Sequence, residues 1–201
     1  MLAVLICLFG HYRKRLLGGV TEGVIYQGDL PVLVVPSFDQ PIETDIGYSR
    51  LLFPTDGSKN SDIAIEHVIE IAKHFDAVIH VVNVVDLQAA GGVFNAGGLE
   101  NTFVKRLETA GKNVLDSVEA EITETTPELD VEPVVVHTSS FEGVAAGIRE
   151  YVSEHDFDLI VMGSHGRSNI KRQLIGSVAS TVLRTVDIPV LVIKRPAQQA
   201  Q

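Results

Sequence analysis

The sequence has one cysteine, Cys7, among its 201 residues, and this scarcity excludes an internal disulfide. It is also short of basic residues: 16 lysines and arginines face 26 aspartates and glutamates, which gives a formal net charge of −10. A protein of that charge is not expected to bind nucleic acid or an anionic membrane. A phosphate-bearing ligand would need backbone N–H groups and a few nearby bases. The lone cysteine fits a reducing compartment, so we expect a cytoplasmic protein.

A transmembrane segment, a signal peptide and a metal-ligand cluster are missing as well. The apolar residues 1–9 are too short to span a bilayer and lack the basic n-region and small-residue cleavage site of a signal peptide. They are either part of the fold or a peculiarity of the chain start. The seven histidines have no cysteine or carboxylate at metal-ligand spacing, so the sequence predicts no metal site built from protein ligands.

What the sequence does contain, from residue 48 onward, is an alternation of strand and helix patterns. Apolar, β-branched runs predict five strands, over residues 51–54, 77–85, 131–137, 158–162 and 189–193. Helical patterns predict helices over 58–73 with Ser58 as N-cap, over 99–125, after a capping box at Ser139 and Glu142, and over 177–186. Residues 86–98, rich in glycine and alanine, predict a mobile loop. Strands of this kind indicate an α/β fold: an open five-stranded parallel sheet with helices on both faces.

The first 36 residues repeat the end of the chain. Residues 13–20 align without a gap with residues 171–178, and the same offset carries 29–35 onto 187–193. This repeat predicts a tandem protein truncated at its front. Residues 1–36 are then a remnant with the last helix and strand of a first copy, 37–47 a linker, 48–196 a complete domain and 197–201 a tail.

The remnant is expected to have a structural role. Its strand, 31–35, could pair with 189–193, either in the same chain or in a partner, which would cover an apolar sheet edge. The prediction includes self-association through 189–193 and through 31–35.

A glycine-rich run follows the fourth predicted strand. Gly163-Ser164-His165-Gly166 is separated by nine residues from Gly176-Ser177-Val178. Glycine lets a ligand approach the backbone, and a Gly-Ser pair that opens a helix offers N–H groups and a hydroxyl to an anion. Parallel sheets bind ligands at the carboxyl ends of their strands, where the strand order reverses. The run therefore predicts a nucleotide phosphate site at that edge.

These residues resemble the universal stress protein family over roughly residues 48–195. The spacing G-x2-G-x9-G-[ST] is similar to that of ATP-binding members, Asp56 matches the acidic residue after the first strand, and Val84 matches the valine that ends the second. The resemblance implies a Rossmann-like fold of the adenine nucleotide alpha hydrolase type. It also implies that the protein binds ATP, ADP or AMP, with Mg²⁺ on the phosphates, and acts as a nucleotide-dependent stress-response module.

The same resemblance implies a role for each matching residue. Asp56 would face the ribose or adenine side, because a carboxylate beside phosphates would be repelled. Arg167, Lys171 and Arg172 could screen the phosphate charge, but we expect them to face solvent instead. For His165 we expect a solvated loop position rather than a catalytic role. The implied binding set is Pro54, Thr55, Asp56, Val84, Met162, Gly163, His165, Gly166, Arg167, Gly176, Ser177 and Val178.

Two other functions stay open. One is a dimerisation module with the same fold and no nucleotide. The other is an adenylate-forming or slow ATP-hydrolysing enzyme, whose second substrate pocket would come from residues 86–98. The sequence shows no Walker lysine, no obvious general base and no magnesium carboxylate beyond Asp56. We therefore assign no catalytic residue and expect slow ATP hydrolysis at most.

Overall fold

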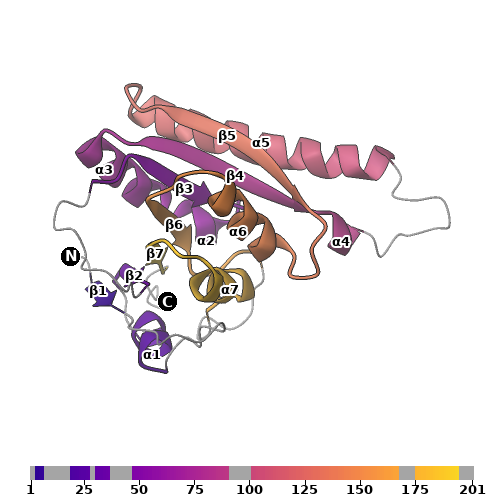
Figure 1. The fold of residues 1–201 in the computed structure, drawn as a ribbon. Coiled ribbons are helices and arrows are strands. Elements are labelled where there is room, and N and C mark those ends of the chain that lie inside the picture. The colour runs from indigo at the N-terminus through magenta and orange to yellow at the C-terminus, as the bar shows by residue number, and fades with distance from the viewer. Residues whose placement is uncertain are drawn as a thin grey trace, which may run out of the picture.

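The centre of the molecule is a mostly parallel β-sheet, drawn in Figure 1. This computed structural model describes residues 3–6, 19–27, 30–36, 47–90, 101–167 and 175–194. In that part of the chain the sheet has seven strands in the order β1-β2-β7-β6-β3-β4-β5. The strands are β1 (Ala3–Ile6), β2 (Val32–Val35), β3 (Arg50–Pro54), β4 (Val78–Asp86), β5 (Val131–Thr138), β6 (Leu159–Gly163) and β7 (Val190–Ile193).

The five strands from β3 to β7 form the predicted parallel sheet, which confirms the α/β fold. β3 lies between β4 and β6, and both pairs are parallel. From β3 the chain proceeds to β4 and β5 on one side, whereas β6 and β7 lie on the other. The strand order therefore reverses beside β3, where a ligand site is expected at the carboxyl edge.

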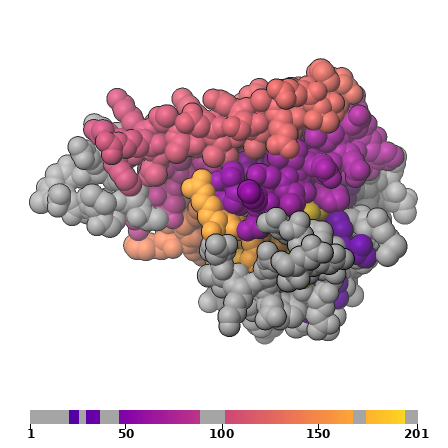
Figure 2. Space-filling model, turned by 180° about the vertical axis from the view of Figure 1, so that it is seen from behind, coloured from indigo at the N-terminus to yellow at the C-terminus, as the bar shows by residue number. Residues whose placement is uncertain are grey.

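Helices cover both faces of the sheet because successive side chains of a strand point to opposite faces and here nearly all of them are apolar. On one face Leu51 and Phe53 pack with α3 (Ile65–Phe75) and α5 (Asn101–Thr125). On the other face Leu52 packs with α6 (Val144–Glu154), α7 (Ser177–Thr185) and α1 (Gly19–Gln27). Figure 2 shows the first face, with the long α5 lying across its upper part. Among the described residues, none of the helices combines the length and apolar character that crossing a bilayer requires.

The helix predicted over 58–73 is two helices, α2 (Lys59–Asp62) and α3. Ser58 is the N-cap of α2 as predicted, and its side chain accepts a hydrogen bond from the Ser61 backbone N–H. A turn at residues 63–64 separates the helices, and α3 buries one stripe with helical spacing before it ends at Asp76. The aspartate adopts the left-handed conformation (φ 55°) that stops the helix.

The predicted capping box at Ser139 and Glu142 is wrong. Helix α6 begins at Val144 with Gly143 as its N-cap, and no side chain caps it. Gly143 has a φ of 62°, a left-handed backbone that separates Glu142 from the helix. Glu142 instead forms an ion pair with Arg149.

The loop predicted over residues 86–98 is also partly wrong. β4 continues through Asp86, and a short helix, α4 (Leu87–Ala90), follows it directly. The rest of that loop lies outside the described residues. So do the tail predicted at 197–201 and most of the predicted linker, 37–46.

The N-terminal segment has the same arrangement as the end of the chain. β1 and β2 are parallel strands joined through α1, as β6 and β7 are joined through α7. The sequence analysis did not predict β1. That the N-terminal segment originates in a first copy of the domain stays a prediction.

β2 also pairs antiparallel with β7, with Val32 opposite Val192. The pairing is within the chain, one of the two arrangements expected. Both edges of β7 are thereby occupied, so self-association through residues 189–193 would require β2 to leave.

Candidate functional site

A cavity of about 270 Å³ lies at the carboxyl ends of β3, β4 and β6, at the point where the strand order reverses. The first residues of α6 and α7 close it from one face of the sheet. Every residue of the predicted binding set lines this cavity, although their binding role stays a prediction. Lys171 and Arg172 lie outside the described residues.

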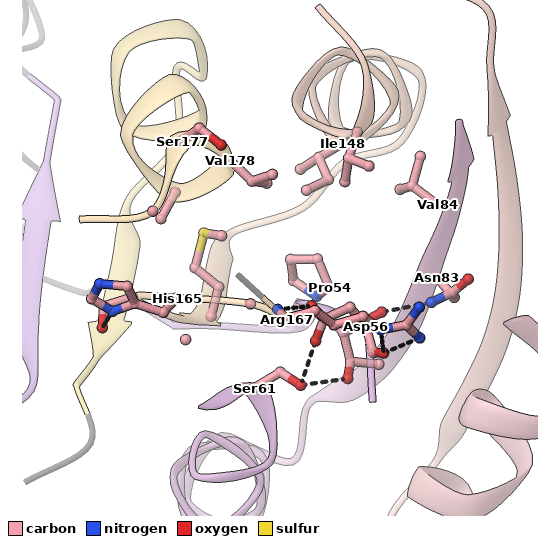
Figure 3. Close-up of a pocket in the computed structure, with 18 of the residues that line it drawn as sticks. Pro54, Asp56, Ser61, Asn83, Val84, Ile148, His165, Arg167, Ser177 and Val178 are labelled. Atoms are coloured by element: carbon pink, nitrogen blue, oxygen red, sulfur yellow. Dashed lines mark hydrogen bonds between the residues drawn. The ribbon is translucent and has the colours of Figure 1, made fainter. Parts of the chain in front are cut away.

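The walls of the cavity differ in polarity. Figure 3 shows the apolar side chains of Val84, Ile148 and Val178 on one side. Asp56 and Ser61 lie on the other, where hydrogen bonds connect them. An apolar wall facing a few fixed polar groups is the usual construction of a small-molecule site.

Asp56 connects the loop after β3 to the glycine-rich loop after β6. Its Oδ1 accepts from the Ser58 N–H at 3.0 Å and from the Ser61 hydroxyl at 3.1 Å. Its Oδ2 accepts from the Arg167 N–H at 2.8 Å. A carboxylate has about four acceptor positions, so Oδ2 can accept one more hydrogen bond, from a ligand.

The pKa values at this end of the cavity follow from the same contacts. Burial alone would raise the pKa of Asp56, but hydrogen bonds from Ser58, Arg167 and Ser61 outweigh it and hold the pKa below its ordinary 3.8. Burial raises the pKa of neighbouring Asp62, a hydrogen bond from Ser61 opposes this shift, and the negative charge of Asp56 adds to it. Because its own pKa lies below 3.8, Asp56 is ionised at neutral pH.

Arg167 contacts the protein itself. Its Nε and Nη2 donate to the Asp56 carbonyl oxygen at 3.0 and 2.6 Å. Arg167 is exposed, the solvent-facing position expected from the sequence, and its guanidinium also clamps the β3 loop to the β6 loop, a contact that was not predicted. The clamp uses Nε and Nη2 of the five-donor guanidinium.

The two glycines of the β6 loop are required by close contacts within the chain. A Cβ at Gly166 would lie 2.4 Å from Asp56 Oδ2, and a Cβ at Gly163 would lie 2.4 Å from the Asn60 carbonyl oxygen. The Asn60 side chain also donates to the Gly166 carbonyl at 3.0 Å. The sequence analysis ascribed these glycines to ligand approach alone, but they also let the loop pack against α2 and Asp56.

The phosphate-binding end predicted from the sequence is the start of α7. Gly176 is the N-cap and Ser177 the first helical residue, and no side chain caps this terminus within the described residues. The Gly176 N–H donates to the Ser164 carbonyl at 2.8 Å, which holds the helix start beside the β6 loop. The positive end of the α7 dipole therefore faces the cavity.

His165 is placed less favourably for binding. Its Nδ1 lies 2.9 Å from the Ser164 hydroxyl, and its buried Nε2 has no partner among the described residues. Figure 3 shows His165 at the opposite end of the view from Asn83 and Val84. It lines the cavity at the end opposite Val84.

Residues that the sequence analysis missed also line the cavity. They are Ser61, Val82, Asn83, Val144, Ile148, Ser164 and Ala179. Asn83 was visible in the sequence as a polar residue inside an apolar strand, and its Nδ2 donates to the Thr55 carbonyl at 2.8 Å. Thr55 Oγ1 lies 3.1 Å from the Ser61 hydroxyl, which contacts Asp56. A chain of polar contacts thus runs from β4 to Asp56.

Asn83 and Gly111 on α5 are predicted to be energetically coupled. A Cβ at Gly111 would lie 2.6 Å from Asn83 Oδ1, so Gly111→Ala should destabilise the protein by about 1 kcal/mol despite the better helix propensity of alanine. In an Asn83→Ala background the clash is gone, and Gly111→Ala should stabilise by up to about 1 kcal/mol. Urea unfolding of the four proteins of this double-mutant cycle measures the change of sign.

Asn83→Ala alone should cost about 1–2 kcal/mol, because the buried Thr55 carbonyl loses its donor. An equal effect of Gly111→Ala in both backgrounds would show that Asn83 and Gly111 do not compete for the same space.

Comparison with known proteins agrees with the fold. The model of the universal stress protein family matches residues 47–194. The universal stress protein MJ0531 of Methanocaldococcus jannaschii is 37% identical over 153 residues, which are 76% of this chain and 85% of that protein. MJ0577 of the same organism is 27% identical, and its solved structure superposes with a TM-score of 0.65 over 76% of this chain and all of that chain.

Two further solved structures share the fold. A universal stress protein solved in complex with cAMP has a TM-score of 0.53 at 22% identity, covering 74% of this chain and 98% of that one. A universal stress protein of Archaeoglobus fulgidus matches 98% of this chain but 62% of its own length, with a TM-score of 0.61 at 21% identity. The family match, the 37% identical relative and the strand order lead to one conclusion: this chain belongs to the universal stress protein family.

Proposed function

We propose that this chain binds an adenine nucleotide, ATP with ADP or AMP as alternatives, and acts as a nucleotide-dependent stress-response module. The observation that carries the proposal is the cavity at the switch point of the sheet. It brings together an apolar wall, a carboxylate with one acceptor position left, and the uncapped start of α7. These are the groups that a base, a ribose and a phosphate chain require.

The nucleoside end of the ligand fits the β3–β4 side of the cavity. Pro54, Val84 and Ile148 supply apolar surface for a planar base. Oδ2 of Asp56 can accept a hydrogen bond from a ribose hydroxyl, and because Asp56 is ionised this bond would be charge-assisted. The negative charge makes the same place unsuitable for phosphates.

The phosphate end fits the start of α7. Its free N–H groups and dipole favour an anion, and the Ser177 hydroxyl adds a donor. Local donors are necessary because the net charge of −10 repels a polyanion at longer range. Asp56 is already engaged by three donors, so Mg²⁺ would be held by phosphate oxygens and water rather than by a protein cage.

The comparisons support the proposal at the level of the fold. The universal stress protein solved with cAMP shows that a relative with this architecture holds an adenine nucleotide. The glycine spacing of this chain, from Gly163 to Ser177, supports extending the proposal from the fold to this site.

Added Mg-ATP is expected to raise the melting temperature. At a free concentration tenfold above Kd, binding to the native state alone stabilises it by about 1.4 kcal/mol. For a chain of this size that corresponds to roughly 3–6 °C. Thermal unfolding with ATP, ADP, AMP and adenosine measures the shift, and mass spectrometry of small molecules released from freshly purified protein identifies a co-purified nucleotide.

Ser177→Ala should weaken ATP binding roughly tenfold by removing one hydrogen bond to an anion, and should leave adenosine binding unchanged. Ser117→Ala on the exposed side of α5 is the matched control and should change neither. If none of the four ligands shifts the melting temperature and none is released, the nucleotide proposal fails.

A further inference from the structure

A second cluster of titratable side chains lies at the amino ends of the strands, away from the cavity. Arg50 is the first residue of β3, His80 the third of β4 and Glu132 the second of β5. Tyr151 approaches them from α6. The His80 ring is at their centre, and the residue is only 2% exposed.

One nitrogen of His80 faces two partners that require opposite protonation states. Arg50 Nη2 lies 2.9 Å from His80 Nε2, and Glu132 Oε2 lies 3.3 Å from the same atom. A guanidinium has only donors, so its hydrogen bond needs a lone pair on Nε2. An ionised carboxylate has only acceptors, so its hydrogen bond needs a proton there. Both bonds cannot exist at once.

The contact with Arg50 is the shorter of the two, and it identifies the protonation state of His80 at rest. With Arg50 donating to Nε2, the neutral ring carries its proton on Nδ1, where the Tyr151 hydroxyl lies at 3.2 Å and accepts it. The Arg50 guanidinium also lies over the Phe157 ring, 5.4 Å from its centroid, and the Phe157 ring meets His80 edge-on at 4.9 Å. Arg50 is thus held beside the histidine by an aromatic contact of its own.

We propose that His80 is a proton-operated switch in which protonation of Nε2 replaces the hydrogen bond from Arg50 by an ion pair with Glu132. The exchange changes the strand that the His80 side chain contacts, from β3 to β5, while the backbone of β4 stays paired with both strands. Nδ1 keeps its proton and its bond to Tyr151 in both states. The imidazolium repels the Arg50 guanidinium, which moves off the ring nitrogen.

The surrounding charges determine the pH at which His80 takes up its proton. Burial lowers the pKa of His80, and Glu132 on β5 raises it. Arg50 on β3 and His155, the C-cap of α6, lower it, and Asp130 raises it. The net pKa lies below the ordinary 6.5, so His80 is neutral at pH 7. On α6 the Tyr151 phenol is neutral as well, because burial raises its pKa. Asp158 accepts from the Arg50 backbone N–H at 2.9 Å and fixes that strand.

The sign of the pH dependence follows. The unfolded chain takes up the proton of His80 near pH 6.5, whereas the folded chain takes it up at lower pH. Folding is therefore weakened as the pH falls from 6.5 to the folded pKa, and is independent of this group above 6.5.

Nitrogen-15 NMR of the histidine rings tests the proposal, with the His80 signals assigned by comparison with His80→Gln. At pH 7.5 we expect a neutral ring protonated on Nδ1, which becomes the imidazolium below pH 6.5. A ring protonated on Nε2, or an imidazolium at pH 7.5, would overturn the assignment.

Two variants test the exchange of partners. Glu132→Gln removes the group that receives the protonated nitrogen and should lower the pKa of His80 by roughly 0.5–1 unit. The matched control is Glu128→Gln, because the Glu128 carboxylate contacts Lys73 at 3.9 Å instead. This variant should leave the pKa of His80 unchanged. Glu132 is half exposed, so its variant should fold. Equal pKa values in the two variants would exclude Glu132 as the partner of the protonated ring.

Discussion

Replacing Gly163 with alanine is expected to destabilise the protein by about 3 kcal/mol. The added Cβ would lie 2.4 Å from the Asn60 carbonyl oxygen and 3.2 Å from the His165 carbonyl oxygen. Because both are backbone atoms, these close contacts can be relieved only if β6 and α2 move apart. Because α2 carries Ser61, a contact of Asp56, nucleotide affinity should fall with stability. Urea unfolding and calorimetric titration with Mg-ATP measure the two effects.

Gly23→Ala is the matched control for this substitution. Gly23 lies in α1, where a Cβ would have no atom within 4 Å. Alanine is the better helix former, so this change should be neutral or stabilise by up to about 1 kcal/mol. Should Gly163→Ala be as harmless as Gly23→Ala, then β6 and α2 are not in the close contact described.

Removal of the Asp56 carboxylate should destabilise the protein by about 2 kcal/mol at neutral pH. Asp56→Ala leaves the N–H groups of Ser58 and Arg167 without their acceptor, whereas the Ser61 hydroxyl can still donate to the Ser58 carbonyl at 2.8 Å. Hydrogen bonds to charged groups contribute about 1.5–3 kcal/mol each when buried, but this half-exposed site is screened by solvent. The variant should also bind adenosine and ATP more weakly to a similar extent, because it acts at the nucleoside end.

The effect of Asp56 should depend on pH. Its folded pKa is below 3.8, so the stabilisation is complete above the unfolded value and is lost as the pH falls through the folded one. The difference in unfolding free energy between the wild type and Asp56→Asn should therefore shrink in acid. Asp116→Asn on the exposed side of α5 is the control and should show little difference at any pH. A wild-type advantage over Asp56→Asn that persists unchanged below the folded pKa would contradict a role for the ionised carboxylate.

The parallel sheet and part of the cavity lining could be predicted from the sequence because both depend on local signals. Runs such as residues 159–162 are apolar throughout, and a strand buried on both faces needs that composition. The glycine spacing predicted that Gly163 and Ser177 lie at the carboxyl edge of the sheet, because parallel strands end at the same edge. Ser58 was found as a cap because its hydrogen bond spans only three residues.

Features that depend on distant contacts could not be predicted. Arg167 is bonded to Asp56, and no pattern in the nine-residue stretch shows this partner on β3. The capping box failed because the left-handed turn at Gly143 overrides a local sequence signature. β1 was missed because a four-residue strand at the chain start has no signal until its partner, β2, is known.

The pairing of β2 with β7 has a consequence for how the chain folds during synthesis. Val32 leaves the ribosome early, but its register partner Val192 is made near the end. At about 5–20 residues per second, the N-terminal strand waits on the order of ten seconds for β7. During that time Val32 and Val34, which are buried in the finished sheet, have no β7 to pair with. β2 is thus made before β3 to β7, yet it completes its place in the sheet only after β7 has been made.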